Sequence, residues 1–175
     1  MSKPSKVIYR NADFDGQLVR TVAAAPVCSS DLGEALATAR SIQRLNASAW
    51  HGAWFAAAEN AKRDADSALA KGDAASARHA YLRASEYFRQ SYYFIRSNLD
   101  DSRLQESYHE HVRSFEAAIA VMDIKAERVS IPYQGTSLVG YLFAPDDAGM
   151  KRPTVFFRAA MTPRQKLVGS TFRRP

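Results

Sequence analysis

Four histidines and a single cysteine are the side chains of this 175-residue sequence best suited to metal binding or nucleophilic catalysis. His109 and His111 stand two residues apart in a segment that favours a helix, so their side chains point about 200° apart and cannot share a metal ion. His51 and His79 have no second candidate ligand three or four residues away. Cys28 has no partner for an internal disulfide, which favours a reducing, cytoplasmic compartment. We therefore expect packed or solvated histidines, no metal site and no cofactor.

The glycines and carboxylates supply no catalytic motif either. The sequence has no Gly-x-Ser-x-Gly nucleophile elbow, and the nearest pattern, at residues 135–140, has the wrong spacing. All 8 glycines are isolated, so there is no glycine-rich phosphate-binding loop. Glu59, Asp64 and Glu86 are interspersed with Lys and Arg, as on the solvated face of a helix. From these residues alone we predict no catalytic side chain.

Aromatic side chains crowd two of the expected helices. Tyr87 and Phe94 fall off the main apolar stripe of their helix, so that helix is aromatic on more than one face. We favour a helix buried between two layers. The alternative is that part of the surface lines a substrate pocket or an interface, and its candidate residues are Trp54, Tyr87, Tyr92 and Tyr93.

The elements that position these side chains begin with helices. Up to about residue 125 the sequence is rich in alanine, which favours helices over residues 31–45, 48–72, 73–97 and 101–122. Asp31 has the spacing of a capping box with Glu34, and Asp73 suits the N-cap of the third helix. In the last helix an apolar stripe, expected to be its buried face, recurs at steps of three and four: Leu104, Tyr108, Val112, Phe115, Ile119 and Met122.

Strand-forming residues follow the helices. Residues 127–133 and 137–144 predict a hairpin around a turn at 134–136. Residues 153–157 predict a third strand, apolar on both faces, although nothing downstream could bury it. The fold class is α+β: a four-helix N-terminal region followed by a β-hairpin and a third strand, as in a sheet that is begun and not finished.

This pattern divides the chain into four parts and confines most of the net charge of +6 to the last of them. We expect an N-terminal extension (1–29), a helical region (30–125), the start of a sheet (126–157) and a basic tail (158–175). The tail holds five Lys or Arg and no acid, which leaves only +1 for residues 1–157. A folded region so nearly neutral argues against nucleic-acid binding. The longest weakly apolar run, residues 21–28, is too short to span a membrane, and no targeting signal is expected.

Several segments resemble a known family. Asn-Ala-Ser-Ala-Trp-His-Gly-Ala-Trp at 46–54 and Ala-Tyr-Leu-Arg-Ala-Ser-Glu-Tyr at 80–87 are similar to the N-terminal helical region of certain α/β hydrolases. Residues 129–145 resemble the first hairpin of their catalytic domain, and 153–157 the strand before the oxyanion loop. The relatives are dihydroxypseudooxynicotine hydrolase and dipeptidyl-peptidase-like esterases, and the resemblance covers roughly residues 30–157.

The resemblance implies a role for the helices. They would form a cap over a cleft that holds a small-molecule substrate in the intact parent enzyme, and could contribute to a homo-oligomer. The serine, aspartate and histidine of the family's triad come later in its chains, so we expect this chain alone to be inactive and truncated before the catalytic core.

The resemblance stops at residue 158. The family implies a Gly-Gly oxyanion loop there, whereas this chain has Arg-Ala-Ala-Met-Thr-Pro-Arg-Gln-Lys. Shifted by one base from the Phe157 codon, the same nucleotides permit Pro-Gly-Gly-Tyr-Asp-Ser, in which the Asp is compelled by Met161 and Thr162. We therefore hypothesise a frameshift near codon 158 and a disordered, out-of-frame tail. The unfinished sheet leads us to expect poor solubility or oligomers.

The main alternative is a helical protein–protein interaction module. Residues 68–81 have some likeness to the turn of a tetratricopeptide repeat. The two expected helices around that turn are about 24 residues each, however, whereas the repeat fits both into about 34 residues and stacks in several copies. No second copy is present.

Overall fold

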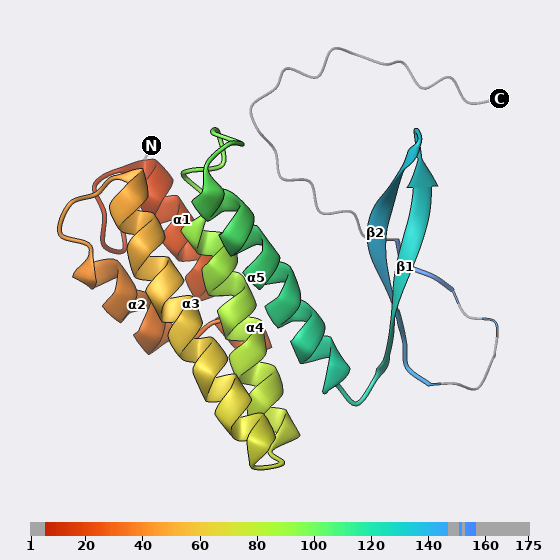
Figure 1. The fold of residues 1–175 in the computed structure, drawn as a ribbon. Helices are drawn as coiled ribbons and strands as arrows, with labels where there is room; N and C mark the ends of the chain where they lie inside the picture. Colours follow the sequence, from red (N-terminus) through yellow and green to blue (C-terminus); the bar gives the residue numbers. More distant parts are fainter. Residues whose placement is uncertain (1–5, 147–150, 152, 157–175) are drawn as a thin grey trace. The chain divides into compact units, whose positions relative to one another are not determined.

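The computed structural model describes residues 6–146, 151 and 153–156 (Figure 1). The elements follow in the order α1 (Ala12–Ala23), a short 3₁₀ helix η1 (Ala25–Val27), α2 (Leu32–Ser41), α3 (Ala47–Ala70), α4 (Ala74–Ser91), α5 (Ser102–Ala120), β1 (Lys125–Tyr133) and β2 (Thr136–Ala144). Backbone contacts divide the chain after Pro145, and all of these elements lie in the first unit. The α+β fold class is confirmed, with helices first and an antiparallel hairpin after them.

Side-chain caps explain where the helices begin. In each α-helix the residue before the first turn accepts a hydrogen bond from a backbone N–H inside the turn; these residues are Asn11, Asp31, Asn46, Asp73 and Asp101. The N-caps predicted from the sequence at Asp31 and Asp73 are confirmed. The carboxylate of Glu34 does not complete a capping box; it accepts a hydrogen bond from the Tyr87 hydroxyl at 2.8 Å.

The sequence pattern predicted four helices, the first starting at Asp31, whereas the structure has a further helix, α1, within residues 1–29. The buried residues of α1 are Asp15, Gln17, Leu18 and Thr21, so its inward face is mostly polar. A polar inward face gives no apolar periodicity, which is why the sequence pattern did not indicate this helix. The carboxylate of Asp15 accepts hydrogen bonds from the backbone N–H groups of Val7, Ile8 and Tyr9 at 2.9–3.0 Å, which ties the preceding segment to the helix.

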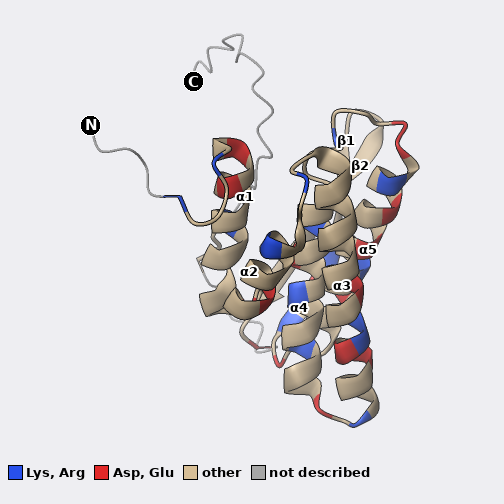
Figure 2. Cartoon of the chain, turned by 90° about the vertical axis from the view of Figure 1, so that its left-hand side faces the viewer, with Lys and Arg blue, Asp and Glu red and all other residues tan. Residues whose placement is uncertain are grey.

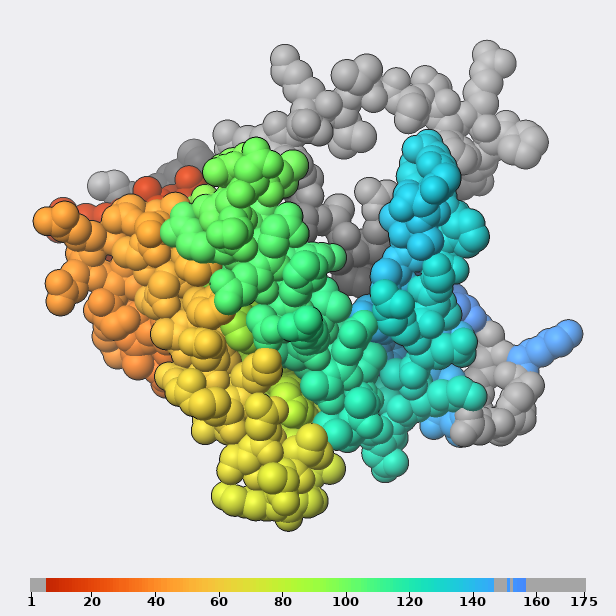
Figure 3. All heavy atoms as spheres, in the orientation of Figure 1, coloured from red at the N-terminus to blue at the C-terminus, as the bar shows by residue number. Residues whose placement is uncertain are grey.

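Helix α4 lies between α3 and α5 and also contacts α1 (Figures 1 and 3). Trp50 and Trp54 from α3 and Tyr87 and Phe88 from α4 are almost completely buried in the main hydrophobic cluster, together with Leu18 from α1. The interpretation of this helix as buried between layers is therefore confirmed, and the packing on several sides explains why Tyr87 lies off the main stripe. Phe94 lies beyond the end of α4, which stops at Ser91 and not near residue 97 as expected.

The buried face of α5 overlaps the expected stripe only at Leu104. Its buried residues are Leu104, Ser107, Ser114 and Ala118, whereas Tyr108 from the expected stripe is 50% exposed. Small side chains on the inward face let two helix backbones approach closely. The other apolar residues of the stripe are half-buried: Val112, Phe115, Ile119 and Met122.

The hairpin forms as predicted. Tyr133 pairs with Thr136 across a turn in which Gln134 and Gly135 both have positive φ, 45° and 77°. Two central residues with positive φ match the twist of the strands, and glycine adopts this conformation without a Cβ clash. Tyr141 of β2 packs its ring 5.1 Å from that of Phe115 in α5.

The third strand expected over 153–157 is not formed in the described residues. Residues 153–156 have no regular secondary structure, and Val155 and Phe156 are 91% and 83% exposed. A strand that is apolar on both faces is stable only inside a sheet, where neighbouring strands satisfy its backbone groups. Phe157 and the tail 158–175, expected to be disordered, lie outside the described residues.

Candidate functional site: two serine–histidine pairs in the helical layer

The structure brings together two serine–histidine pairs that sequence spacing could not show. The first joins α3 to α5: His51 Nε2 lies 3.0 Å from Ser107 Oγ. Ser107 is fully buried and His51 is 8% exposed. Burial lowers the pKa of His51, the positive charge of Arg103 lowers it further, and Asp101 opposes this. The ring is therefore held neutral. The partners are 56 residues apart in the sequence, so no local motif could have indicated the pair.

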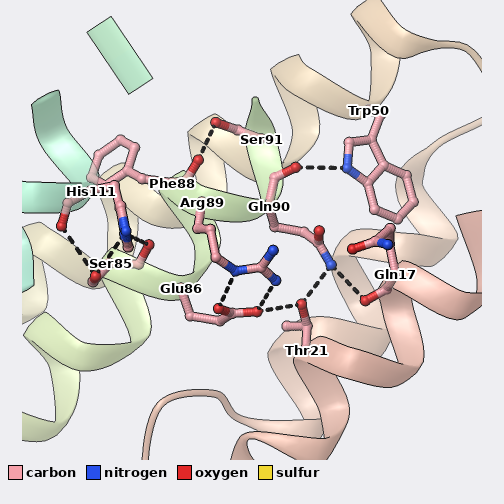
Figure 4. A network of polar contacts seen from close by, with 10 residues as sticks. All are labelled: Gln17, Thr21, Trp50, Ser85, Glu86, Phe88, Arg89, Gln90, Ser91 and His111. Atoms are coloured by element: carbon pink, nitrogen blue, oxygen red, sulfur yellow. Dashed lines mark hydrogen bonds and ion pairs between the residues drawn. The ribbon is translucent and has the colours of Figure 1, made fainter. Parts of the chain in front are cut away.

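The second pair joins α4 to α5. His111 Nδ1 lies 2.9 Å from both Ser85 Oγ and Ser85 O, and the Ser85 hydroxyl donates to the carbonyl of His111 at 3.1 Å (Figure 4). With the proton on Nδ1, the ring donates to the Ser85 carbonyl. Burial lowers the pKa of His111, which keeps this ring neutral too. These reciprocal bonds link two helix backbones.

Neither pair has the arrangement that acyl transfer needs. A serine nucleophile requires a base whose second nitrogen is held by a carboxylate, an oxyanion site made of N–H donors, and access for substrate. Among the described residues, no nitrogen of the His51 or His111 ring forms a hydrogen bond with a carboxylate. The two serines are at most 5% exposed. These pairs stabilise the packing of the helices.

A buried polar network continues from α4 to α1 and α3 (Figure 4). The side-chain amide of Gln90 donates to Thr21 Oγ1 and to the carbonyl of Gln17, both at 2.6 Å. The Thr21 hydroxyl donates to Glu86 Oε1 at 2.8 Å, and Glu86 also pairs with Arg89 at 2.6 Å. Burial alone would lower the pKa of Arg89, but the hydrogen bonds and charge of Glu86 outweigh it and raise that pKa. The network holds α1 against α4.

The four aromatic candidates occupy different environments. Trp54 and Tyr87 are fully buried and Tyr92 is 4% exposed. Burial raises the pKa of Tyr92 to about 12. Tyr93 is partly exposed, with the Arg96 guanidinium 3.8 Å from its ring centre. Three of the four thus lie inside the helical layer of this chain, and a role in substrate binding or in an interface remains a prediction for all four.

An open groove of about 410 Å³ involves residues of α3, α4 and α5. Two phenylalanines, four carboxylates and two cations line it: Phe55, Phe88, Glu59, Asp66, Glu106, Glu110, Lys62 and Arg63. Lys62 of α3 pairs with Glu110 of α5 at 2.5 Å. Figure 2 shows charges of both signs interspersed along the helices. The lining contains no serine, cysteine or histidine.

Among the described residues, no group of three or more histidine, cysteine, aspartate and glutamate side chains could hold a metal ion. Within that same part of the chain, no helix has the length and apolar character needed to cross a membrane.

A helical region followed by the first hairpin of a sheet is the arrangement that the sequence predicted for the start of an α/β hydrolase, and comparison with known proteins supports this class. No protein-family model matches the chain. It is 36% identical over 142 residues to the protein named hydrolase acrC from Aspergillus aculeatus, a match that covers 78% of this chain and 33% of acrC.

Two further relatives are named alpha/beta hydrolase. The chain is 36% identical over 150 residues to alpha/beta hydrolase xenA from Xenoacremonium sinensis, covering 83% of the chain and 35% of xenA. It is 39% identical over 133 residues to alpha/beta hydrolase pydG from Acremonium sp, covering 75% and 31%. The chain is thus homologous to α/β hydrolases over about four fifths of its length, and it spans about a third of the length of these relatives.

Proposed function

We propose that this chain is the helical cap region and first hairpin of an α/β hydrolase of the esterase, peptidase or carbon–carbon bond hydrolase type, and that it is inactive on its own. The observation that carries the proposal is homology to hydrolases over most of the chain, combined with serine–histidine pairs that are buried and that, within the described residues, form no hydrogen bond to a carboxylate. In the intact parent the helices cover a cleft for a small-molecule substrate.

The proposed inactivity follows from what hydrolysis requires. The developing negative charge on the carbonyl oxygen needs preorganised N–H donors, and the nucleophile needs a base beside it. The sequence has no nucleophile elbow, and at position 158 it has Arg-Ala-Ala where the family resemblance implies a Gly-Gly loop. We attribute this departure to a one-base frameshift near codon 158.

An active-site probe tests the inactivity. The purified chain is treated with a fluorophosphonate and assayed with p-nitrophenyl acetate, next to full-length hydrolase acrC as the positive control. We expect neither stoichiometric labelling nor turnover above the rate in buffer. Labelling of the chain that disappears in Ser107→Ala or Ser85→Ala would show that a serine in the helical layer is a nucleophile after all, and would overturn the proposal.

The frameshift is tested separately by sequencing the gene. We expect a second reading frame, displaced by one base, that encodes a Gly-Gly loop and then a nucleophile elbow downstream of codon 157. If the DNA beyond this codon encodes no such frame, the frameshift is rejected, whereas the homology of the helical region is unaffected.

A further inference from the structure

A cluster of four side chains joins the last helix to the hairpin. The register places Arg128 of β1 directly opposite Tyr141 of β2, so both side chains lie on the same face of the two strands. Both reach the same carboxylate oxygen of α5: the Tyr141 hydroxyl donates to Glu116 Oε1 at 2.9 Å, and Arg128 Nε lies 3.2 Å from that atom. The ring of Phe115 packs edge-on against that of Tyr141, at 5.1 Å and an angle of 76°. Two adjacent residues of α5 thus hold one residue from each strand.

The backbone between α5 and β1 does not fix the direction of the hairpin by itself. It consists of residues 121–124, which belong to no helix or strand. The N–H groups of Val121 and Met122 still bond back to the last turn of α5, whereas Asp123 and Ile124 are exposed. A few such residues at the end of an element can absorb a change in φ and ψ at low cost, as in the hinges of other proteins. The angle between α5 and the hairpin therefore depends on side-chain contacts.

The contacts of this cluster can be broken and formed again. The side chains of Glu116 and Arg128 are 37% and 59% exposed, and an ion pair with that exposure contributes little to stability. Tyr141 is half-buried, and its hydroxyl and its ring both contact α5. Several weak contacts that converge on adjacent residues can define one orientation without locking it.

We propose that Phe115 and Glu116 form a latch on Arg128 and Tyr141 that sets the angle between α5 and the hairpin, and that residues 121–124 are the hinge about which this angle changes when the latch is released. Glu116 is a positioning residue, because it acts through its contacts with both strands. The inference rests on the proposed function in one respect, that the helices are the cap of a hydrolase. On that basis the latch sets the position of the cap on the start of the sheet, and its release moves the cap.

Distances between two spin labels test the latch in the purified chain. The labels are attached at two exposed positions, through His109→Cys on α5 and Thr136→Cys at the start of β2. Cys28, the free cysteine of the chain, is replaced by Cys28→Ser so that only these two positions are labelled. Pulsed double electron–electron resonance should give one narrow distribution of distances, because the latch holds the hairpin at one angle to α5.

Substitutions in the latch should broaden this distribution. Glu116→Gln removes the ion pair with Arg128, and Tyr141→Phe removes the hydroxyl that donates to Glu116, so each variant should populate several angles. The matched controls are Glu106→Gln, at an exposed position on the same helix, and Tyr133→Phe, at the exposed end of β1. Both controls should keep the narrow distribution of the original chain.

An exchange of charges separates the latch from a general loss of stability. Glu116→Arg places two guanidinium groups next to each other and should broaden the distribution. Adding Arg128→Glu restores an ion pair in the reverse order, and the Tyr141 hydroxyl, which can also accept a hydrogen bond, keeps a partner on α5. The narrow distribution should then return. Helix content and the thermal midpoint confirm that each variant is folded.

The titration of Tyr141 gives a second measurement. Burial raises the pKa of the Tyr141 phenol above its ordinary value of 10.0, the Glu116 carboxylate raises it further, and Arg128 lowers it. Glu116→Gln should therefore lower the pKa of Tyr141, whereas the control Glu106→Gln should leave it unchanged. Nuclear magnetic resonance of tyrosine labelled at Cζ measures this pKa for the individual residue.

A distribution that is already broad in the original chain would overturn the latch, because the contacts then do not hold the hairpin in solution. A distribution that stays narrow in both Glu116→Gln and Tyr141→Phe would also reject it, as would broadening that the exchange of charges fails to reverse. None of these results bears on the proposed function, which the fluorophosphonate assay tests independently. A labelled serine would reject the proposed function and leave the measured distances as they are.

Discussion

At the scale of single residues, His51 and His111 each reach from one helix to a serine on another. Burial lowers the pKa of both rings from the ordinary value of 6.5. The unfolded chain therefore binds protons more readily than the folded chain does. The stability that the neutral rings contribute is present above about pH 6.5 and is lost as the pH falls through that value towards the lower pKa of the folded state.

We therefore expect the free energy of unfolding to fall as the pH is lowered from 7 to 5. Urea midpoints measured by circular dichroism at several pH values between 5 and 7 give the slope of stability against pH. Carboxylates contribute little to this slope, because they titrate mainly at lower pH. The double variant His51→Gln, His111→Gln should have a flatter slope. His109→Gln, an exposed position on α5, should keep the slope of the original chain. Equal slopes for the original chain and the double variant would contradict this account.

The ion pair of Glu86 and Arg89 predicts that one substitution, Glu86→Gln, strongly lowers the free energy of unfolding. Their side chains are only 14% and 22% exposed. Glu86→Gln leaves the Arg89 guanidinium without a counter-ion and weakens the bond to Thr21, so we expect a loss of about 3 kcal/mol in the free energy of unfolding. Glu59→Gln, at an exposed position on α3, should change it by less than about 0.5 kcal/mol. Urea denaturation measures the free energy of unfolding of both variants. If both lose a similarly small amount, the ion pair of Glu86 and Arg89 makes no net contribution to stability.

At the scale of elements, α1 and α5 show how a helix can dock without a conventional apolar stripe. Helix α1 turns Asp15, Gln17 and Thr21 inward. Backbone N–H groups satisfy the Asp15 carboxylate and side chains of α4 bond the Thr21 hydroxyl, whereas Gln17 Oε1 has no hydrogen-bond partner among the described residues. Helix α5 turns Ser107 and Ser114 inward. Ser107, Asp15 and Thr21 have hydrogen-bonding partners on other segments, which offsets much of the cost of burying their polar groups.

The docking of α1 can be tested through its one fully buried leucine. Leu18 is 0% exposed and the next residue, Val19, is 44% exposed. Leu18→Ala should lower the free energy of unfolding by about 2–5 kcal/mol, because it leaves a cavity beside the aromatic cluster. Val19→Ala should change it by about 0.5 kcal/mol or less. If the two variants have equal stability in urea, α1 does not pack on the other helices in solution.

At the scale of the whole molecule, the described elements differ in how completely they are packed. Helices α3 and α4 contribute most of the buried aromatic residues, whereas the hairpin has exposed apolar residues on both strands. Its side-chain links to α5 include the contact of Tyr141 with Phe115 and the hydrogen bond that the Tyr141 hydroxyl donates to Glu116 at 2.9 Å. Local opening should therefore begin in the hairpin.

Hydrogen exchange on dilute, monomeric protein measures this difference. The amides of the hairpin that point towards the partner strand, such as those of Val129 and Ile131, should exchange faster by orders of magnitude than core amides of α4 such as those of Ala84 and Phe88. Exchange of all four amides at one common rate would indicate that the hairpin and the helices open as a single cooperative unit.

The sequence predicted those parts of the fold that depend on neighbouring residues. Asp31 and Asp73 marked helix starts through capping, and Gln134-Gly135 marked the turn through its tolerance of positive φ. The predicted third strand over 153–157 failed because a strand depends on a neighbour that local sequence does not supply. The sequence did not predict the serine–histidine pairs for a related reason: the serine and the histidine of each pair are 26 and 56 residues apart in the chain.

The sequence by itself thus determined the order and type of most elements and the likeness to the α/β hydrolases, because caps, turns and apolar periodicity act within a few residues. Only the tertiary structure decided that α1 is a docked helix, that α5 turns its small residues inward, and that His51 and His111 bind buried serines. Those outcomes depend on which polar groups find partners on distant segments, and the free energy of burying a polar side chain is set by that partner and not by the residue alone.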